Sequence, residues 1–298
     1  MKSSVFVAPG TGKQGQAVTR ELLRRGHSVH ILTRNPSSDA AERLQAMGAV
    51  LHTGDLGSVK TIQAALENVD AVFLAIPANP TEEIAYAKNV IEAAQEKGVK
   101  HFVYSGVART GEHESFPHWN DNYPLAWYWK NKHAIEHIVR TAGFEYWSIL
   151  RPAFFIQNFC YPDVKYMFPG LADAHELRVA FNTETQLDLI DVSDIANFAV
   201  AAIESPSKFS RKEISLAAEK LTAVQIAERL SKMSGRKVTV GYLTDEEVIA
   251  LQKQGYLAVL AQVWQRDVGY GVDIDVLKWY GIPLTPLSGA LNRDALGW

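Results

Sequence analysis

The chain begins with the stretch Ser3-Ser4-Val5-Phe6-Val7-Ala8-Pro9-Gly10-Thr11-Gly12-Lys13-Gln14-Gly15, an apolar run that leads into a glycine-rich turn. A helical pattern follows over residues 16–23. Strand, glycine turn and helix start are the parts of a dinucleotide-binding loop, because glycines let backbone N–H groups approach a pyrophosphate and the helix start adds partial positive charge. We expect the cofactor to be bound by the loop residues Gly10, Thr11, Gly12, Lys13, Gln14 and Gly15. The alternative is a plain strand-to-helix turn.

Strand-like and helical patterns alternate from this loop to about residue 150. The expected strands are Val5–Val7, Val29–Thr33, Val50–Thr53, Ala71–Ile76, His101–Ser105 and Tyr146–Leu150. The expected helices are Lys13–Arg25, Ala40–Met47, Val59–Glu67 (with Ser58 as cap), Ile84–Lys97 and Ala134–Thr141. This alternation predicts an α/β fold with a doubly wound parallel sheet, whose ligands lie beyond the carboxyl ends of the strands.

The pattern loosens after residue 152, although helices are expected at Val192–Ala202, Thr222–Ser234 and Thr244–Gln254 and strands at Gln186–Val192 and Lys237–Tyr242. We expect residues 1–152 plus about 186–213 to form the dinucleotide-binding domain. Residues 153–185 plus about 214–298 are expected to form a smaller, partly helical portion that binds the substrate.

Composition excludes several classes of protein. The 298 residues carry a formal net charge of −3 and show no basic stripe, so no nucleic-acid partner is expected. No apolar run reaches the roughly 18 residues of a membrane span, and no signal peptide is evident. A single cysteine, Cys160, is typical of a reducing compartment, so we expect a cytoplasmic protein. The histidines lack clustered Cys or acidic partners, so no metal site is expected.

The end of the second expected strand, Thr33-Arg34-Asn35-Pro36-Ser37-Ser38, indicates which dinucleotide is bound. An acid at this place holds the ribose 2′-hydroxyl of NAD, whereas an arginine accommodates the 2′-phosphate of NADP. No acid precedes Arg34 in residues 29–34. We therefore expect Arg34 to bind the phosphate, with further hydrogen bonds from Ser37 and Ser38. The alternative is a solvated surface arginine.

Two further strand ends are expected to contact the cofactor. After the third strand, Asp55 can accept a hydrogen bond from the adenine amino group and Leu56 can pack on the ring. The alternative for Asp55 is a cap on the next helix. The end of the fourth strand supplies Ala75, Ile76 and Pro77.

The stretch Tyr128-Trp129-Lys130-Asn131-Lys132 fits the pattern Y-x-x-x-K. On a helix the two residues lie one turn apart, and a lysine ammonium there lowers the pKa of the phenol. Tyr128 then serves as general acid for a carbonyl that receives hydride, and Lys132 also holds the nicotinamide ribose. The alternative is a chance match within an aromatic run. The aromatic loop at residues 113–129 is either a wall of the substrate pocket or a packed cluster.

Several motifs together resemble the NmrA-like group of atypical short-chain dehydrogenase/reductases. They are the Gly10–Gly15 loop, Thr33–Pro36, Gly54–Leu56, Gly98–Gly106, Lys132 with Ala134–Glu136, Arg151–Asn158 and Asp191–Ala196. The resemblance implies a Rossmann-type domain that binds NADP(H) and a small C-terminal domain. It also implies that Lys132, Pro152, Phe154 and Phe155 lie at the nicotinamide side, and that Lys88 faces the cofactor as in some relatives.

The resemblance implies two functional types. One is an NADPH-dependent reductase of a small apolar or aromatic carbonyl, imine, enone or quinone; the other is an NADP(H)-sensing regulator that binds a protein partner. A third reading is an isomerase or epimerase that uses the nicotinamide transiently. The chain departs from the family pattern at Pro9, where Gly10 is expected to take over a positive φ, and at Val107, where typical reductases have a serine. We favour the reductase because a regulator has no need of Tyr128.

Overall fold

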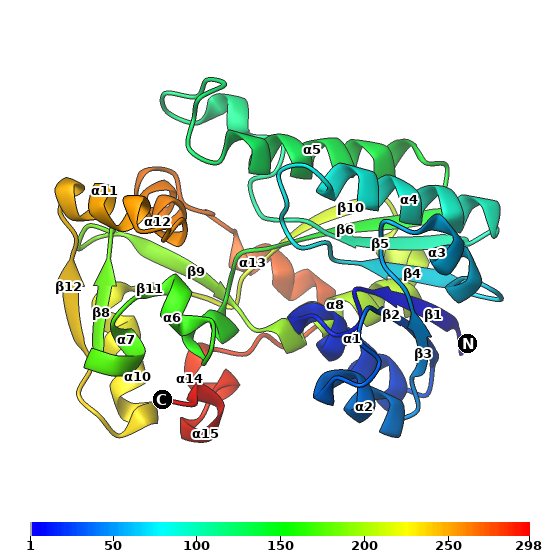
Figure 1. Ribbon diagram of the computed structural model, residues 1–298, viewed down its shortest axis with the longest axis horizontal. Coiled ribbons are helices and arrows are strands. Elements are labelled where there is room, and N and C mark those ends of the chain that lie inside the picture. Colours follow the sequence, from blue (N-terminus) through cyan, green and yellow to red (C-terminus); the bar gives the residue numbers. More distant parts are fainter. Residues whose placement is uncertain (1) are drawn as a thin grey trace. The chain divides into compact units, whose positions relative to one another are not determined.

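The computed structural model describes residues 2–298, which form two compact units (Figure 1). The first unit contains residues 2–111, 127–152 and 192–215, and the second contains residues 112–126, 153–191 and 216–298. The sequence placed residues 186–191 in the first unit, but they belong to the second. The reason is that this stretch pairs with two strands of the second unit.

The first unit is built on a seven-stranded sheet with the order β10-β6-β5-β4-β1-β2-β3. Its strands are β1 (Ser4–Ala8), β2 (Ser28–Thr33), β3 (Val50–Thr53), β4 (Ala71–Leu74), β5 (His101–Ser105), β6 (Tyr146–Pro152) and β10 (Lys212–Leu216). From β3 to β6, each neighbouring pair is parallel. The doubly wound parallel α/β fold is thus confirmed. The order reverses on either side of β1, where ligands of such sheets bind.

Helices cover both faces of this sheet, as Figure 1 shows. One face carries α3 (Val59–Ala65), α4 (Glu83–Glu96) and α5 (Ala126–Thr141), and the other carries α1 (Lys13–Arg24), α2 (Asp39–Ala46) and α8 (Val192–Glu204), with α9 (Pro206–Phe209) following α8. Fully buried Phe6, Phe102 and Tyr104 pack in the core beneath α3, α4 and α5. Burial of apolar side chains on both faces explains why these strands are nearly continuous hydrophobic runs.

Most first-unit elements lie within two residues of their predicted bounds, but α5 differs. It begins at Ala126 rather than Ala134, so the aromatic run Trp127–Trp129 is its first turn and not a loop. Trp129 and Ile135 are buried on the face that also holds Lys132. The polar residues between them obscured this helical pattern. A smaller correction concerns Ser58, which precedes α3 without a side-chain capping hydrogen bond.

The second unit is a smaller α/β assembly. Its strands are β7 (Phe154–Phe155), β8 (Glu176–Val179), β9 (Gln186–Ile190), β11 (Glu219–Thr222) and β12 (Thr239–Tyr242). Its α-helices are α6 (Val164–Met167), α7 (Leu171–Ala174), α10 (Ala223–Ser234), α11 (Asp245–Lys253), α12 (Ala258–Asp267), α13 (Ile274–Leu277), α14 (Leu287–Ala290) and α15 (Arg293–Leu296), and short 3₁₀ turns are η1 (His113–Ser115), η2 (Ile156–Phe159) and η3 (Lys278–Tyr280). Strand β9 pairs with β7 and β11, and β8 pairs with β12. Thr222 caps α10, in a capping box with Gln225.

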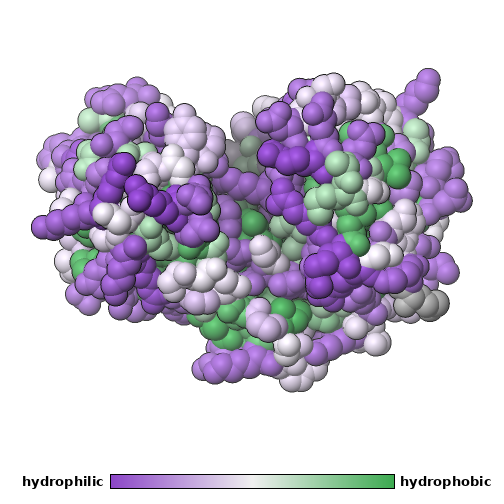
Figure 2. All heavy atoms as spheres, turned by 90° about the horizontal axis from the view of Figure 1, so that it is seen from below, coloured by the Kyte–Doolittle hydropathy of each residue, from purple (hydrophilic) through white to green (hydrophobic). Residues whose placement is uncertain are grey.

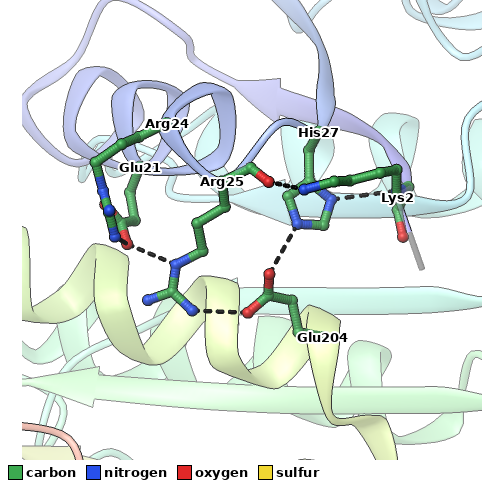
Figure 3. A network of polar contacts seen from close by, with 7 residues as sticks. Lys2, Glu21, Arg24, Arg25, His27 and Glu204 are labelled. Atoms are coloured by element: carbon green, nitrogen blue, oxygen red, sulfur yellow. Dashed lines mark hydrogen bonds and ion pairs between the residues drawn. The ribbon is translucent and has the colours of Figure 1, made fainter.

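An ion-pair network lies at the amino ends of the sheet strands in the first unit (Figure 3). Arg25, at the end of α1, lies 2.7 Å from Glu204 at the end of α8 and 2.6 Å from Glu21. His27 lies 3.1 Å from the other oxygen of Glu204 and accepts a hydrogen bond from the Ser3 N–H. The network links the ends of α1 and α8 to the start of β1. It lies at the amino ends of the strands, whereas ligands in such folds bind at the carboxyl ends.

One face of the molecule is mostly covered with hydrophilic side chains, with hydrophobic side chains confined to patches between them (Figure 2). Such a distribution is ordinary for a surface in contact with water. Within residues 2–298, no helix is both long enough and apolar enough to cross a membrane. The same residues contain no group of three or more His, Cys, Asp or Glu side chains arranged to hold a metal ion.

Acid is expected to destabilise the protein through His101. This side chain on β5 is 5% exposed, and burial lowers its pKa from 6.5 to about 4. Between these pH values the unfolded chain binds a proton that the folded chain does not, so stability is full above pH 6.5 and falls as the pH drops toward 4. The loss amounts to about 3 kcal/mol. Urea unfolding of the wild type and of His101→Phe between pH 4 and 7.5 checks this: the variant should lose about 3 kcal/mol less over the range, and equal slopes would contradict the prediction.

Candidate functional site

The glycine loop between β1 and α1 is held by close packing. The Gly10 N–H donates to the Leu32 carbonyl at 3.2 Å, and a Cβ on Gly10 would lie 2.4 Å from the Ile31 Cβ. A Cβ on Gly15 would lie 2.1 Å from the Pro9 carbonyl oxygen. Gly10 has no positive φ, contrary to expectation. Glycine is required at both positions by the approach of neighbouring atoms and not by backbone conformation.

The first turn of α1 has backbone N–H groups that no side chain caps. Gly12 is the N-cap and offers no side chain to the N–H groups of the first turn, which begins at Lys13. A Cβ on Gly12 would meet nothing closer than Pro9 at 3.7 Å, so the space there is open. In general, uncapped N–H groups at the start of a helix favour an anion such as phosphate. The Gln14 side chain is engaged, because its Oε1 accepts a hydrogen bond from Ser105 Oγ at 2.7 Å.

A pocket of about 390 Å³ lies beside this loop at the carboxyl ends of β1 to β4. The predicted residues that line it are Thr11, Gly12, Arg34, Asp55, Leu56 and Pro77. The other residues that line it are Pro9, Leu32, Thr33, Gly54, Ala78, Asn79, Glu82 and Tyr86. All belong to the first unit. The pocket therefore joins the glycine loop to the strand ends where an adenosine moiety binds in folds of this type.

The charges in the pocket have mixed signs. The Arg34 Nε lies 3.9 Å from an Asp55 oxygen, and the Arg34 side chain is 85% exposed. Glu82 adds a second carboxylate, and a hydrogen bond between Tyr86 and Glu82 raises the pKa of the Tyr86 phenol. Asp55 does not cap α3; its Oδ1 accepts from the Gly57 N–H at 2.8 Å. Arg34 is the basic residue among those that line the pocket, and Asp55 and Glu82 are the acidic ones.

Ser37 and Ser38 do not line the pocket. Ser38 is the N-cap of α2: its hydroxyl accepts from the Ala41 N–H at 3.3 Å and donates to the Asn35 carbonyl at 3.0 Å. The Ser37 N–H donates to the Asn35 side chain at 3.1 Å. The structure thus gives Ser38 a local role in starting a helix, which a Ser followed by a helical pattern also indicates.

Tyr128 and Lys132 lie one turn apart on α5, as the Y-x-x-x-K pattern predicts. The Lys132 Nζ is 5.6 Å from the centre of the Tyr128 ring. It also lies 2.6 Å from a Glu83 oxygen and donates to the Ile76 carbonyl at 3.3 Å. The lysine charge is therefore balanced by a carboxylate, which weakens its effect on the phenol. Ala75 follows the last residue of β4, and its N–H donates to the Ala8 carbonyl at the end of β1.

At the position where typical short-chain reductases are expected to have a serine, this chain has Val107. Val107 is buried at 5% exposure and carries no donor. Ser105 is equally buried, and its hydroxyl donates to Gln14. A reductase built on this chain would therefore rely on Tyr128 and Lys132 without that serine.

The remaining predicted positions lie elsewhere in the two units. Pro152 ends β6, where its carbonyl accepts from the Ala108 N–H. Phe154 belongs to the second unit, and its ring packs 5.9 Å from Phe159 and 5.8 Å from Phe168. Phe155 is the next residue of β7, and Lys88 is exposed on α4. Contact of Pro152, Phe154 and Phe155 with the nicotinamide stays a prediction.

Most of the aromatic loop packs within the second unit. The Phe116 ring lies 5.8 Å from Trp264 of α12 and 6.1 Å from Trp119. Trp119 in turn lies 5.0 Å from Tyr123. These contacts favour a packed cluster for residues 113–123. Trp127, Tyr128 and Trp129 belong to the first unit instead.

Sequence reasoning missed Glu82, Glu83 and Tyr86. Glu82 and Tyr86 are four residues apart at the start of a predicted helix, and this spacing alone indicated that they share a face. Glu83 had no such signal, because an acid in the first turn of a helix is usually explained by the helix dipole.

The chain is similar in sequence to a family of known proteins. A family model described as the NmrA-like family matches residues 1–275. An NmrA-like family domain-containing protein of Dictyostelium discoideum is 28% identical over 260 residues, 83% of this chain and 82% of the relative. An NAD(P)H azoreductase of Xenophilus azovorans is 28% identical over 247 residues (82% and 78%), and the nitrogen metabolite repression protein nmrA of Emericella nidulans is 25% identical over 264 residues (86% and 72%).

Solved structures show the same fold. The triphenylmethane reductase of Citrobacter sp., complexed with NADP(H), superposes with a TM-score of 0.78 at 21% identity over 99% of this chain and 100% of that chain. Nmra, a negative transcriptional regulator complexed with NAD, gives a TM-score of 0.74 at 22% identity over 90% and 84%. Since the family model spans both units of the structure, the chain belongs to the NmrA-like family.

Proposed function

We propose that this chain is an NADPH-dependent reductase of a small, apolar or aromatic carbonyl, imine, enone or quinone. The observation that carries the proposal is that one unit contains the glycine loop, the pocket beside it, and Tyr128 and Lys132 one turn apart on α5. Relatives named as an NAD(P)H azoreductase and a triphenylmethane reductase support this class of chemistry.

The residues of the pocket fit the parts of the cofactor. The uncapped first turn of α1 would hold the pyrophosphate, and Gly10 and Gly15 keep the loop close enough to do so. Arg34 would pair with the 2′-phosphate, and Leu56 would pack on the adenine. When bound, the nicotinamide supplies the hydride.

Tyr128 and Lys132 supply the other half of the reduction. The Tyr128 hydroxyl donates a proton to the substrate atom that becomes negative, which is worth roughly 10²- to 10⁴-fold in rate. The Lys132 ammonium has three N–H groups and donates one of them to the Ile76 carbonyl, which leaves an N–H donor for the nicotinamide ribose. The Tyr128 ring lies beside those of its neighbours Trp127 and Trp129, with ring centres 6.0 and 5.3 Å away, so its surroundings on α5 are aromatic.

The direct test is NADPH oxidation by the purified protein with a panel of quinones, imines and enones, followed by absorbance at the NADPH band. Turnover of at least one class is expected. Tight NADPH binding without turnover of any class would contradict the reductase.

Replacing Arg34 with glutamine is expected to weaken NADPH binding about 10- to 100-fold and to leave NADH binding nearly unchanged. The reason is the loss of a charge-assisted hydrogen bond to phosphate, worth about 1.5–3 kcal/mol. Calorimetric titration of both dinucleotides measures the effect, with Arg20→Gln as control because Arg20 is exposed on α1 and absent from the pocket lining. Equal losses for both dinucleotides would show that Arg34 does not read the phosphate.

A second candidate function is an NADP(H)-sensing regulator. Two observations favour it: Val107 stands where typical reductases have a serine, and Lys132 already forms an ion pair with Glu83. The relatedness to nitrogen metabolite repression protein nmrA agrees with this class. Affinity purification from source cells with NADPH, with NADP⁺ and with neither tests it, since a regulator requires a partner whose recovery depends on the dinucleotide.

A further inference from the structure

The segment from Ile76 to Glu83 has two sides. One side lines the pocket, through Pro77, Ala78, Asn79 and Glu82. The other side contacts α5 at three points. The Ile76 carbonyl accepts from Lys132, the Asn79 carbonyl accepts from Asn131 Nδ2 at 3.2 Å, and Glu83 forms an ion pair with Lys132.

The ion pair between Glu83 and Lys132 is unusually buried. The Glu83 side chain is 0% exposed and the Lys132 side chain 6% exposed, with 2.6 Å between Oε1 and Nζ. Within residues 2–298, neither Glu83 oxygen has a hydrogen-bond partner beyond this ion pair. A buried carboxylate with so little other support depends on its cation, and removing one partner of such a pair leaves an uncompensated charge.

The pair also restricts what Lys132 can do. Lysine has a flexible four-carbon stem and about 2 kcal/mol of rotamer entropy. The Ile76 carbonyl accepts one of its three N–H groups, and the Glu83 carboxylate, paired with the ammonium at 2.6 Å, holds it in place. Glu83 itself is the first residue of α4, whose first turn also places Glu82 and Tyr86 on the pocket wall.

We propose that Glu83 is a positioning residue: it fixes the Lys132 ammonium and ties the pocket wall at residues 76–83 to the helix that carries Tyr128. The inference rests on the proposed function, because Lys132 is there assigned to the nicotinamide ribose. In a purely structural role, Glu83 would affect stability alone.

The experiment compares Glu83→Gln, Glu83→Asp and a matched control, Glu204→Gln, which breaks an ion pair at the amino end of the same unit. NADPH affinity is measured by calorimetric titration below the melting temperature of each variant. Glu83→Gln should raise the Kd for NADPH at least about 10-fold and lower kcat by a similar factor. Glu83→Asp should recover part of both, and Glu204→Gln should change neither.

A double-mutant cycle in the absence of dinucleotide tests the pair independently of activity. Glu83→Gln and Lys132→Met should each lower the melting temperature by on the order of 5–10 °C, and the double variant should regain much of that loss because no buried charge is left. The double variant should still bind NADPH weakly. Wild-type NADPH affinity in folded Glu83→Gln would overturn the inference and leave the reductase standing, as would an additive cycle. Failure of the wild type to bind NADPH would instead overturn the proposed function, whatever the cycle shows.

Discussion

Replacing Gly15 with alanine is expected to weaken dinucleotide binding strongly and to destabilise the protein. The added Cβ would lie 2.1 Å from the Pro9 oxygen and 2.9 Å from the Gly10 oxygen, both of them backbone atoms. Neither can swing away as a side chain would, so α1 or the loop must move. We expect a loss of about 3 kcal/mol in the free energy of unfolding from this overpacking.

The shift of the loop is also expected to raise the Kd for NADPH at least about 100-fold, or 2.7 kcal/mol. The matched control is Gly12→Ala, where the new Cβ meets nothing closer than 3.7 Å and the backbone is extended. Gly12 lines the pocket, so this variant should melt close to the wild type and still bind NADPH more weakly. Calorimetric titration and urea unfolding of both variants measure these effects. A Gly15→Ala protein with wild-type stability and affinity would show that the loop does not pack as described.

Replacing Tyr128 with phenylalanine is expected to lower kcat about 10²- to 10⁴-fold while NADPH affinity and melting temperature stay near the wild-type values. The change removes the proton donor and keeps the ring that packs against Trp127 and Trp129. Because the dinucleotide pocket is lined by other residues, binding should be spared. Steady-state kinetics on whichever substrate class supports turnover, with titration of NADPH, separates the two effects.

The control for this experiment is Tyr146→Phe, because Tyr146 lies at the amino end of β6, away from the pocket lining. It removes a phenol of the same unit and should leave kcat unchanged. If Tyr128→Phe retained full turnover, the proton would have to come from another group or from water. The general-acid role of Tyr128 would then be abandoned, although the dinucleotide site would remain.

Local sequence patterns predicted the sheet well because each pattern reports a local cause. A strand such as β5 is a short apolar run ended by a turn, and a helix such as α1 ends where Gly26 takes a positive φ of 81°. The same reasoning failed for the start of α5, which lies at Ala126 and not at the expected Ala134. Aromatic residues have only moderate helix propensity, and burial of Trp129 decided the matter.

Among the residues expected to bind the cofactor, those that line a common pocket lie at strand ends. Arg34 and Asp55 follow consecutive strands, so the parallel sheet brings them to the same pocket. The Ser38 hydroxyl caps the start of α2, and its expected contact with a phosphate stays a prediction. The pattern of a serine ahead of a helix indicated that use as readily as it indicated a phosphate ligand.

The sequence by itself determined the doubly wound fold, the glycine loop and the residues at the strand ends. Periodicity and turn chemistry act over short stretches of chain, so local patterns show where strands, helices and the glycine loop lie. The residues at the strand ends then follow from the topology of a parallel sheet, which brings the carboxyl ends of its strands together. Only the tertiary structure decided that Gly10 and Gly15 are required by contact with Ile31 and Pro9. It likewise decided that Lys132 is paired with Glu83. These facts depend on side chains and backbone atoms that are distant in the chain and meet only when the sheet and its helices have assembled. Burial then makes the Glu83 carboxylate and the Lys132 ammonium depend on each other.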